Sequence, residues 1–361
     1  MHDGMTLAEL AEEVKRQEEA KHDFVSPTMK MNMEAPLSMR SEREAPPISL
    51  AVGNVGSFEL SEIAHGQIAQ WAGIPKKYYD RLRTSARRLL EDNVNVWLHR
   101  SDDRRMVRTL DGRGRAFLSD RYRPLDNTLV MEAALPSMLQ EQGMTVKSCQ
   151  LTDRRLYIQA VTKRLEGEVR QGDVVQAGLV LSNSEVGCGS VRVEPLIFRL
   201  ACLNGMITRT AIKKYHVGKR VGGNGPDDVA WEFYRDETRQ ADDRAFLLKI
   251  RDTVGNALDE QAFQEEVNRL RRATQDALPA GKTAAVVEEV TRRLDLTQQE
   301  GESVLESLIQ DGDLSRYGLA NAITAQANEA ESYDRAVDLE RVGHEVIELA
   351  PQNWETVVSA A

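Results

Sequence analysis

The chain has 361 residues, of which 41% are hydrophobic, and a net charge of −10, so it can form one large domain or two moderate ones. Its three cysteines include no CxxC pair, which argues against a disulfide framework and a closed structural zinc site. The N-terminus is charged throughout, and no apolar run approaches the ~20 residues that span a bilayer. We therefore expect a cytoplasmic protein with no membrane partner.

Charge is distributed unevenly along the chain. Residues 1–50 carry a net charge of −4, residues 51–220 carry +9 and residues 221–361 carry −15. A basic middle between acidic ends is typical of a protein with a polyanion partner, but a well-solvated surface of varying sign gives the same pattern. Both interpretations stay open at this point.

The first 50 residues are predicted to be a short helix followed by a flexible arm. Residues 6–21 have apolar side chains on one helical stripe, with Thr6 as a candidate N-cap. Residues 22–50 hold four of the eleven prolines and four methionines without sustained periodicity. This composition indicates a linker or an arm that orders only against a partner.

Two helices are predicted next, joined by the tight turn AGIPKK. Apolar spacing after Ser57 predicts a helix that ends at Gly73, and Pro75 begins a second helix through Leu90. The pair resembles a helix-turn-helix, although a helical hairpin packed on a sheet is the preferred interpretation because the motif has many false positives. The basic residues of the second helix, which would face phosphates, are Lys76, Lys77, Arg81, Arg83, Arg87 and Arg88.

An arginine-rich hairpin follows. Val94, Val96 and Leu98 alternate with polar residues, which predicts a half-buried strand. The turn Asp111-Gly112 lies between two β-capable runs, residues 106–110 and 113–118, and predicts a β-hairpin. Arginines crowd this hairpin and its exit, at positions 100, 104, 105, 108, 113, 115, 121 and 123.

The remaining chain is predicted to be strands and then helices. The periodicity predicts a helix over residues 127–142, strands over 145–151, 155–162 and 174–183, and a further strand after the turn Gly187-Cys188-Gly189. We expect residues 196–207 to turn helical and to end at Asn204-Gly205. Residues 228–346 have the pattern of successive amphipathic helices.

This order of elements favours an α+β fold, with a twisted, mainly antiparallel sheet and packed helices followed by an all-helical part. The Gly-rich run VGGNGPDD after Lys219-Arg220 indicates a domain boundary. The predicted organisation is therefore a flexible arm over residues 1–50, a basic α+β core domain over 51–220 and an acidic helical domain over 221–361.

Catalytic motifs are missing from the sequence, which has no GxSxG, P-loop, HExxH or strand-linked GxGxxG. His65 lies beside apolar residues and is interpreted as structural, while Cys188 has no histidine near it in sequence. Asp102-Asp103 and Asp227-Asp228 are interpreted as turn or helix-start residues rather than magnesium ligands. We therefore expect no enzymatic activity, cofactor or metal.

The basic hairpin has the composition of a polyanion site. Single-strand binders combine a basic groove with aromatic platforms, and Trp97, Tyr122, Tyr157, Phe198 and Tyr215 lie among or near the basic residues. Since aromatics make up only 5% of the chain, arginine and lysine contacts to the backbone must supply most of the affinity. The predicted DNA-binding residues are Arg100, Arg104, Arg105, Arg108, Arg113, Arg115, Arg121, Tyr122, Arg123, Lys213, Lys214, Lys219 and Arg220.

Three segments carry a family resemblance, HGQIAQWAGIPKKYYDRL at 65–82, GRAFLSDRYRPLDN at 114–127 and the run from Gly178 to Ile207. In this order they resemble phage- and plasmid-borne proteins grouped as domain of unknown function 932, a name that implies no activity. At the level of arrangement alone, the strands, Gly-rich turn and following helix also resemble phage single-strand annealing proteins of the Redβ and RecT kinds. That arrangement implies an oligomer that holds single strands in a basic groove without ATP.

The leading hypothesis is a homo-oligomeric single-stranded DNA-binding protein that promotes annealing in phage or plasmid recombination. Its acidic C-terminal part would screen the groove or recruit a phage or host recombination protein. Salt-sensitive binding, lost when Arg113 and Arg115 are changed to Ala, is expected. The alternatives are a helix-turn-helix regulator that binds duplex DNA through residues 60–90, and a protein-interaction module whose arginines pair with the acidic C-terminal part.

Overall fold

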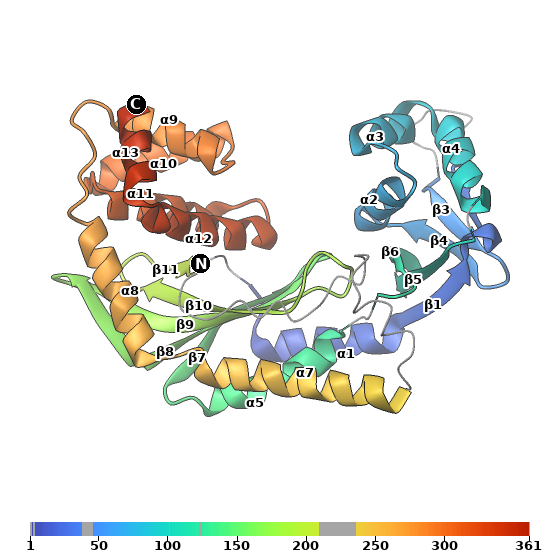
Figure 1. Ribbon diagram of the computed structural model, residues 1–361, viewed down its shortest axis with the longest axis horizontal. Helices are drawn as coiled ribbons and strands as arrows, with labels where there is room; N and C mark the ends of the chain where they lie inside the picture. The colour runs from blue at the N-terminus through green and yellow to red at the C-terminus, as the bar shows by residue number, and fades with distance from the viewer. Residues whose placement is uncertain are drawn as a thin grey trace.

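The computed structural model describes residues 2, 4–37, 46–100, 102–122, 125–208 and 236–360. Figure 1 shows a long central sheet with a small N-terminal lobe at one end and a cluster of C-terminal helices at the other. Helices and strands are both abundant and the central sheet is antiparallel, so the predicted α+β class is confirmed. No helix within these described ranges is long and apolar enough to cross a membrane.

The molecule has three parts. The lobe consists of β1 (Lys21–Pro27), η1 (Thr28–Lys30), β2 (Met31–Glu34), β3 (Ser49–Val52), β4 (Gly56–Leu60), α2 (Glu62–Trp71), α3 (Lys76–Ser85), α4 (Arg87–Arg100), β5 (Arg104–Leu110) and β6 (Arg113–Ser119). The body consists of α1 (Leu7–Ala20), α5 (Asn127–Gln140), β7 (Met144–Leu151), β8 (Leu156–Arg170), β9 (Asp173–Asn183), β10 (Arg192–Arg199), β11 (Asn204–Ile207) and α7 (Asp236–Asn256). The helical cluster consists of α8 (Glu260–Ala273), α9 (Thr283–Arg293), α10 (Gln298–Asp311), α11 (Arg316–Ala325), η3 (Gln326–Glu329), α12 (Tyr333–Glu348) and α13 (Pro351–Ala360).

The body sheet has the strand order β11-β10-β9-β8-β7, with every pair antiparallel. Both of its faces are covered, which explains why the central strand β9 is buried along nearly its whole length. Leu156 and Ile158 of β8 face a core shared with α1, α5 and α7. Tyr157 and Val161 point to the opposite face, where they pack with Tyr333 of α12.

The C-terminal helices share their cores with the body sheet. Ile250 and Val254 of α7 join the core beneath the sheet, next to α5. Val267 of α8 packs close to Gly167 of β8, and Tyr157 Oη donates a hydrogen bond to Asp334 at the start of α12, 2.7 Å away. The C-terminal helices are therefore docked onto the body sheet, with α7 beneath it and α8 to α13 at the far end from the lobe (Figure 1).

The lobe contains a six-stranded sheet in the order β1-β5-β6-β4-β3-β2, in which only β4 and β6, among the described strands, run parallel. The predicted hairpin is present as β5 and β6. Asp111 and Gly112 have φ angles of 51° and 75°, as the preferred two-residue hairpin turn requires. The helix predicted to begin at Thr6 is also confirmed, because the Thr6 hydroxyl accepts from Glu9 N and Glu9 accepts from the backbone of Thr6.

The expectation of a loose arm differs from the structure over residues 21–34. Residues 21–27 form β1, which pairs antiparallel with β5, and Met31 and Met33 of β2 are buried in the lobe core. Pro27 is tolerated because β1 is an edge strand and Pro27 is its last residue, where no ladder hydrogen bond is needed from its nitrogen.

The strand predicted over residues 94–98 is wrong, because this segment belongs to α4. Val94 and Leu98 lie four residues apart and both point into the lobe core. The Asn95 side chain pairs with the backbone of Met33, accepting from its N–H at 2.7 Å and donating to its carbonyl at 3.0 Å. A helix thus covers the edge of β2 that would otherwise be open to another strand.

The helix predicted over residues 196–207 is also wrong. Residues 196–199 continue β10, and residues 204–207 form β11, which pairs back onto it. Leu203, with a φ angle of 51°, lies in the intervening turn. Leu196 and Ile197 are both buried because the two faces of the sheet are covered, and such continuous burial resembles a helix in the sequence.

Candidate functional site

The arginines of the β5–β6 hairpin fall into a buried group and an exposed group. Arg108 has no exposed surface, and its guanidinium donates to Asp23, Asp126 and the Glu185 carbonyl at 2.7–2.8 Å. Burial alone would lower the pKa of Arg108, but the two carboxylates outweigh that effect and raise it. The prediction that Arg108 contacts DNA is wrong, because the side chain is enclosed by protein.

Arg115 is the second buried arginine. Its side chain is 14% exposed, and its Nη2 lies 2.7 Å from Glu185 Oε2. The other carboxylate oxygen of Glu185 accepts from Asn127 N at the start of α5. One glutamate therefore connects the hairpin of the lobe to α5 and to the end of β9 in the body.

The Gly-rich turn over residues 184–190 forms the joint between lobe and body. Gln67 of α2 donates to the Val186 carbonyl at 2.7 Å, and Val186 packs on Leu118 of the hairpin. Gly187 has a φ angle of 76°, and a Cβ there would meet the Leu118 side chain at 2.7 Å. Tyr122, a predicted DNA contact, is largely buried here and donates to the Ser184 carbonyl at 3.3 Å.

Other predicted contacts lie on the surface of the lobe. Arg100, Arg104, Arg113 and Arg121 are exposed. Arg105 is half-buried, 5.5 Å from the centre of the Trp71 ring and within 3.2 Å of Asp103. The predicted residues Arg123, Lys213, Lys214, Lys219 and Arg220 lie outside the described residues.

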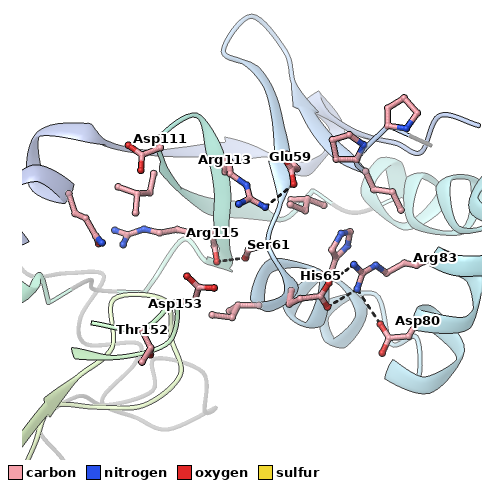
Figure 2. Close-up of a pocket in the computed structure, with 18 of the residues that line it drawn as sticks. Glu59, Ser61, His65, Asp80, Arg83, Asp111, Arg113, Arg115, Thr152 and Asp153 are labelled. Atoms are coloured by element: carbon pink, nitrogen blue, oxygen red, sulfur yellow. Dashed lines mark hydrogen bonds and ion pairs between the residues drawn. The ribbon is translucent and has the colours of Figure 1, made fainter. Parts of the chain in front are cut away.

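Arg113 and Arg115 line a cleft of about 950 Å³ beside the joint (Figure 2). Its walls come from α1, the β4–α2 connection, α3, the start of α4, the hairpin turn and the β7–β8 turn. The sequence predicts Arg83 and Arg87 on a basic helix, but neither they nor Arg16 are among the predicted DNA-binding residues. The arginines of the lining are Arg16, Arg83, Arg87, Arg113 and Arg115, and its carboxylates are Glu13, Glu59, Glu62, Asp80, Asp111 and Asp153.

Ion pairs surround this cleft. Arg113 Nη2 lies 2.7 Å from Glu59 Oε1, and Arg16 Nη1 lies 2.9 Å from Asp111 Oδ1. Figure 2 shows Arg83 at the other side, pointing toward Asp80, 3.5 Å away. With five arginines and six carboxylates, the lining is nearly neutral. An incoming anion must therefore exchange with carboxylates rather than enter an unbalanced positive site.

His65 lies at the floor of the cleft but is buried. Its Nδ1 lies 2.8 Å from Tyr79 Oη. Burial, assisted by the charge of Arg83, lowers the pKa of His65 to about 3, so the ring is neutral at physiological pH. Its interpretation as a structural histidine is consistent with this environment.

Aromatic platforms are missing from the lining, since no Trp, Tyr or Phe is among the described residues that form the cleft. Of the aromatics associated with the basic residues in the sequence, Tyr157 and Phe198 are buried and Tyr215 lies outside the described residues. Trp97 is exposed, but on α4 and not in the cleft. Any nucleic acid in the cleft would be held through its phosphates.

The described ranges hold no group of three or more His, Cys, Asp or Glu side chains that could bind a metal ion. The cysteines Cys149, Cys188 and Cys202 are all free thiols.

Comparison with known proteins identifies one family. Residues 116–221 match the model described as Domain of unknown function (DUF932). No curated protein and no solved structure matches the chain. The matched range begins within β6 and includes α5, the Gly-rich turn and the strands of the body sheet. The resemblance to domain of unknown function 932 predicted from the sequence is confirmed over residues 116–221, while the segment at 65–82 lies outside the matched range.

Proposed function

We propose that the protein binds single-stranded DNA through phosphate contacts in the cleft, without ATP, and serves strand annealing in phage or plasmid recombination. The observation that carries the proposal is the convergence of five arginines, from α1, α3, α4 and the hairpin, on one cleft of about 950 Å³. Planar guanidinium groups match the oxygens of a phosphate in a bidentate manner.

A phosphate that enters the cleft would compete with the carboxylates that are paired with the arginines. Arg16 and Arg113 are about half-exposed and paired with Asp111 and Glu59, and exposed pairs of this kind are worth only about 0–1 kcal/mol. A phosphate can therefore replace either carboxylate at low cost. Salt competes with the same contacts, so binding is expected to weaken steeply as ionic strength rises.

The recessed position of the arginines favours a single strand over a duplex. Arg115 and Arg83 are mostly buried, with side chains 14% and 22% exposed. A duplex is stiff over about 150 base pairs and carries its phosphates on the outside of a cylinder, so it cannot bend into a cleft of this size. A flexible single strand can.

Fluorescence anisotropy with labelled single-stranded and duplex oligonucleotides at low salt tests the proposal. Tighter binding of the single strand is expected, with a clear loss for the double variant Arg16→Ala/Arg113→Ala. Arg115 is left unchanged because its removal would leave the buried Glu185 carboxylate without its arginine partner. The control is Lys77→Ala/Arg81→Ala, which removes two exposed cations outside the cleft. Absence of binding by the unchanged protein would reject the proposal.

A duplex-binding helix-turn-helix is the second candidate, favoured by the surface of α3. Lys77, Tyr78 and Arg81 are exposed on this helix, and neither Lys77 nor Arg81 forms an ion pair with the described part of the chain. If α3 reads duplex DNA, Lys77→Ala/Arg81→Ala abolishes binding and Arg16→Ala/Arg113→Ala leaves it intact. The two double variants thus separate the two functions.

The third candidate has the hairpin arginines paired with the acidic C-terminal helices. Arg108, Arg113 and Arg115 instead take their carboxylate partners from positions 23–185 of the chain. Pairing with the C-terminal helices therefore gains no support from these three residues.

A further inference from the structure

A row of polar side chains crosses the end of the body sheet that adjoins the Gly-rich turn. In this row Tyr157 of β8 is paired with Ser182 of β9, and Ser182 is paired with Arg192 of β10. Residues directly opposite one another on antiparallel strands share one face of the sheet. Tyr157 identifies this face as the one that packs against α12. The row therefore places a hydroxyl next to a guanidinium group, just beyond the joint between lobe and body.

Two side chains of this row have hydrogen-bond donors without an acceptor. Ser182 has no exposed surface, and its Oγ has no hydrogen-bond partner in the described part of the chain. Arg192 is half-buried, its enclosed Nε is also without a partner, and it forms no ion pair with a described residue. Buried polar groups in native proteins are normally hydrogen-bonded. Both donors are therefore available to an acceptor that binds from outside the chain.

The charges around Arg192 favour an anion as that acceptor. Burial lowers the pKa of Arg192. The charge of Glu194 opposes this effect, but the charges of Arg341 and Arg155 act in the same direction as burial. Arg341 is itself paired with Glu194 and Asp338, at 2.6 Å and 3.0 Å. Glu194 is thus bound by another arginine and does not neutralise Arg192.

Arg155 contributes a second unpaired guanidinium group. It lies in the β7–β8 turn, whose residues Thr152 and Asp153 line the cleft. Its Nη2 donates to the Cys188 carbonyl in the Gly-rich turn, and it forms no ion pair with a described residue. A Cβ at Gly189 would lie 2.3 Å from the same Nη2. Glycine at this position therefore leaves the space that the Arg155 guanidinium occupies.

We propose that Arg155, Arg192 and Ser182 form a phosphate-binding site separate from the cleft, whose lining includes none of the three. Guanidinium groups bind phosphate oxygens through paired N–H donors, and the hydroxyl can donate one more hydrogen bond. A phosphate also supplies the negative charge that the two unpaired guanidinium groups favour. Its source is either the DNA strand, since the β7–β8 turn connects the site to the cleft, or a small phosphorylated molecule.

Thermal unfolding with inorganic phosphate as the probe tests the site. The background protein is Arg16→Ala/Arg113→Ala, so the exposed arginines of the cleft do not contribute, and chloride at equal ionic strength is the reference. Phosphate raises the Tm of many proteins by exclusion from their surface, so the rise is compared between variants. The rise is expected to be smaller when Arg192→Ala or Arg155→Ala is added. Arg192→Lys should keep part of it.

A matched control and the chloride data separate binding from misfolding. Arg154→Ala removes an exposed arginine beside Arg155 and is expected to keep the full rise. In chloride, Arg192→Ala should unfold at the same or a higher temperature than the background protein, because it removes a desolvated, unpaired charge. Equal rises in the background protein, Arg192→Ala and Arg155→Ala would overturn the proposal, since the unpartnered donors would then serve water alone.

Oligonucleotide binding distinguishes the two sources of the phosphate. With Arg16 and Arg113 intact, Arg192→Ala should make the slope of log affinity against log salt shallower by roughly 0.7 if the strand occupies the site. An unchanged slope, together with a reduced effect of inorganic phosphate, assigns the site to a small phosphorylated molecule. Absence of oligonucleotide binding with an Arg192-dependent phosphate effect would reject the proposed function and still support this site.

Discussion

Burial controls the chemistry of several ionisable side chains, among them Glu340 on α12, which is almost completely enclosed. Its Oε2 accepts a hydrogen bond from Gln159 of β8 at 2.7 Å, and no cation among the described residues forms an ion pair with it. Burial raises its pKa from an ordinary value of 4.5 to about 7. The folded protein therefore holds this proton more tightly than the unfolded chain does.

Stability is expected to fall as pH rises from about 4.5 to about 7, because over that window Glu340 ionises in the unfolded chain but stays protonated in the folded protein. Glu340→Gln removes this cost. It should be more stable than the unchanged protein above pH 7, by on the order of 3 kcal/mol, and equal to it below pH 4.5. Urea unfolding at a series of pH values checks this. A difference that does not depend on pH would contradict the assigned role of Glu340.

His344 contributes pH dependence of the same sign. Although burial lowers the pKa of His344, hydrogen bonds to Glu266 and Glu348 raise it overall. Its stabilising effect is complete below the unfolded pKa and is lost as pH rises through the folded pKa. The slope that remains in Glu340→Gln is therefore expected to come partly from His344.

Arg108 is expected to be essential for stability rather than for binding. Arg108→Ala leaves the carboxylates of Asp23 and Asp126 without their buried partner, which costs about 3–5 kcal/mol. Arg104→Ala in the same strand changes an exposed side chain and should stay within about 0.5 kcal/mol. Thermal or urea unfolding distinguishes the two. Equal effects would show that Arg108 does not hold the joint together.

At the scale of elements, the sequence predicted the hairpin and the body strands well, since local signals define them. The dipeptide Asp111-Gly112 favours a hairpin turn, in which both residues adopt positive φ angles. The strand β9 can be predicted because its sequence is a short apolar run. The buried role of Arg108 could not be predicted from the sequence, because its partners Asp23 and Asp126 are 85 and 18 residues away in the chain. A count of arginines cannot separate a buried ion pair from an exposed cation.

The errors in element type have the same origin. In α4, Val94, Val96 and Leu98 alternate as in a strand, but Val96 is exposed while the other two point into the core. The exposed Val96 completes the alternating pattern, and the sequence therefore predicts a half-buried strand where the structure has a helix. Apolar residues that do not contribute to the core of their own chain make a prediction from periodicity wrong.

The carboxylates along the cleft are expected to limit DNA binding. Glu59→Gln/Asp111→Asn removes the pair of Arg113 with Glu59 and that of Arg16 with Asp111, while Arg16 keeps its pair with Glu13. Affinity for single-stranded DNA should rise about three- to tenfold, because each exposed pair is worth up to about 1 kcal/mol.

A variant with the same change in net charge provides the control for that experiment. Asp92→Asn/Glu132→Gln alters two exposed carboxylates that do not line the cleft. An equal gain in both double variants would attribute the effect to net charge. A loss of affinity in Glu59→Gln/Asp111→Asn would show instead that the carboxylates position the arginines for binding.

At the scale of the whole molecule, the cleft lies where the lobe meets the body, and the helices α8 to α13 lie at the opposite end (Figure 1). The overall charge of −10 therefore says little about the cleft. The lobe and the body are held together by the Gly-rich turn and by the Glu185 contacts. Substitutions in that joint should disturb the cleft as well as stability.

The salt dependence of single-strand binding tests the central claim most directly. The affinity of the unchanged protein and of Arg16→Ala/Arg113→Ala is measured for the same oligonucleotide over a salt series. If the two arginines contact phosphates, the slope of log affinity against log salt becomes shallower by about 1.4, or roughly 0.7 per contact. Parallel slopes for the two proteins would contradict phosphate binding by Arg16 and Arg113 in the cleft.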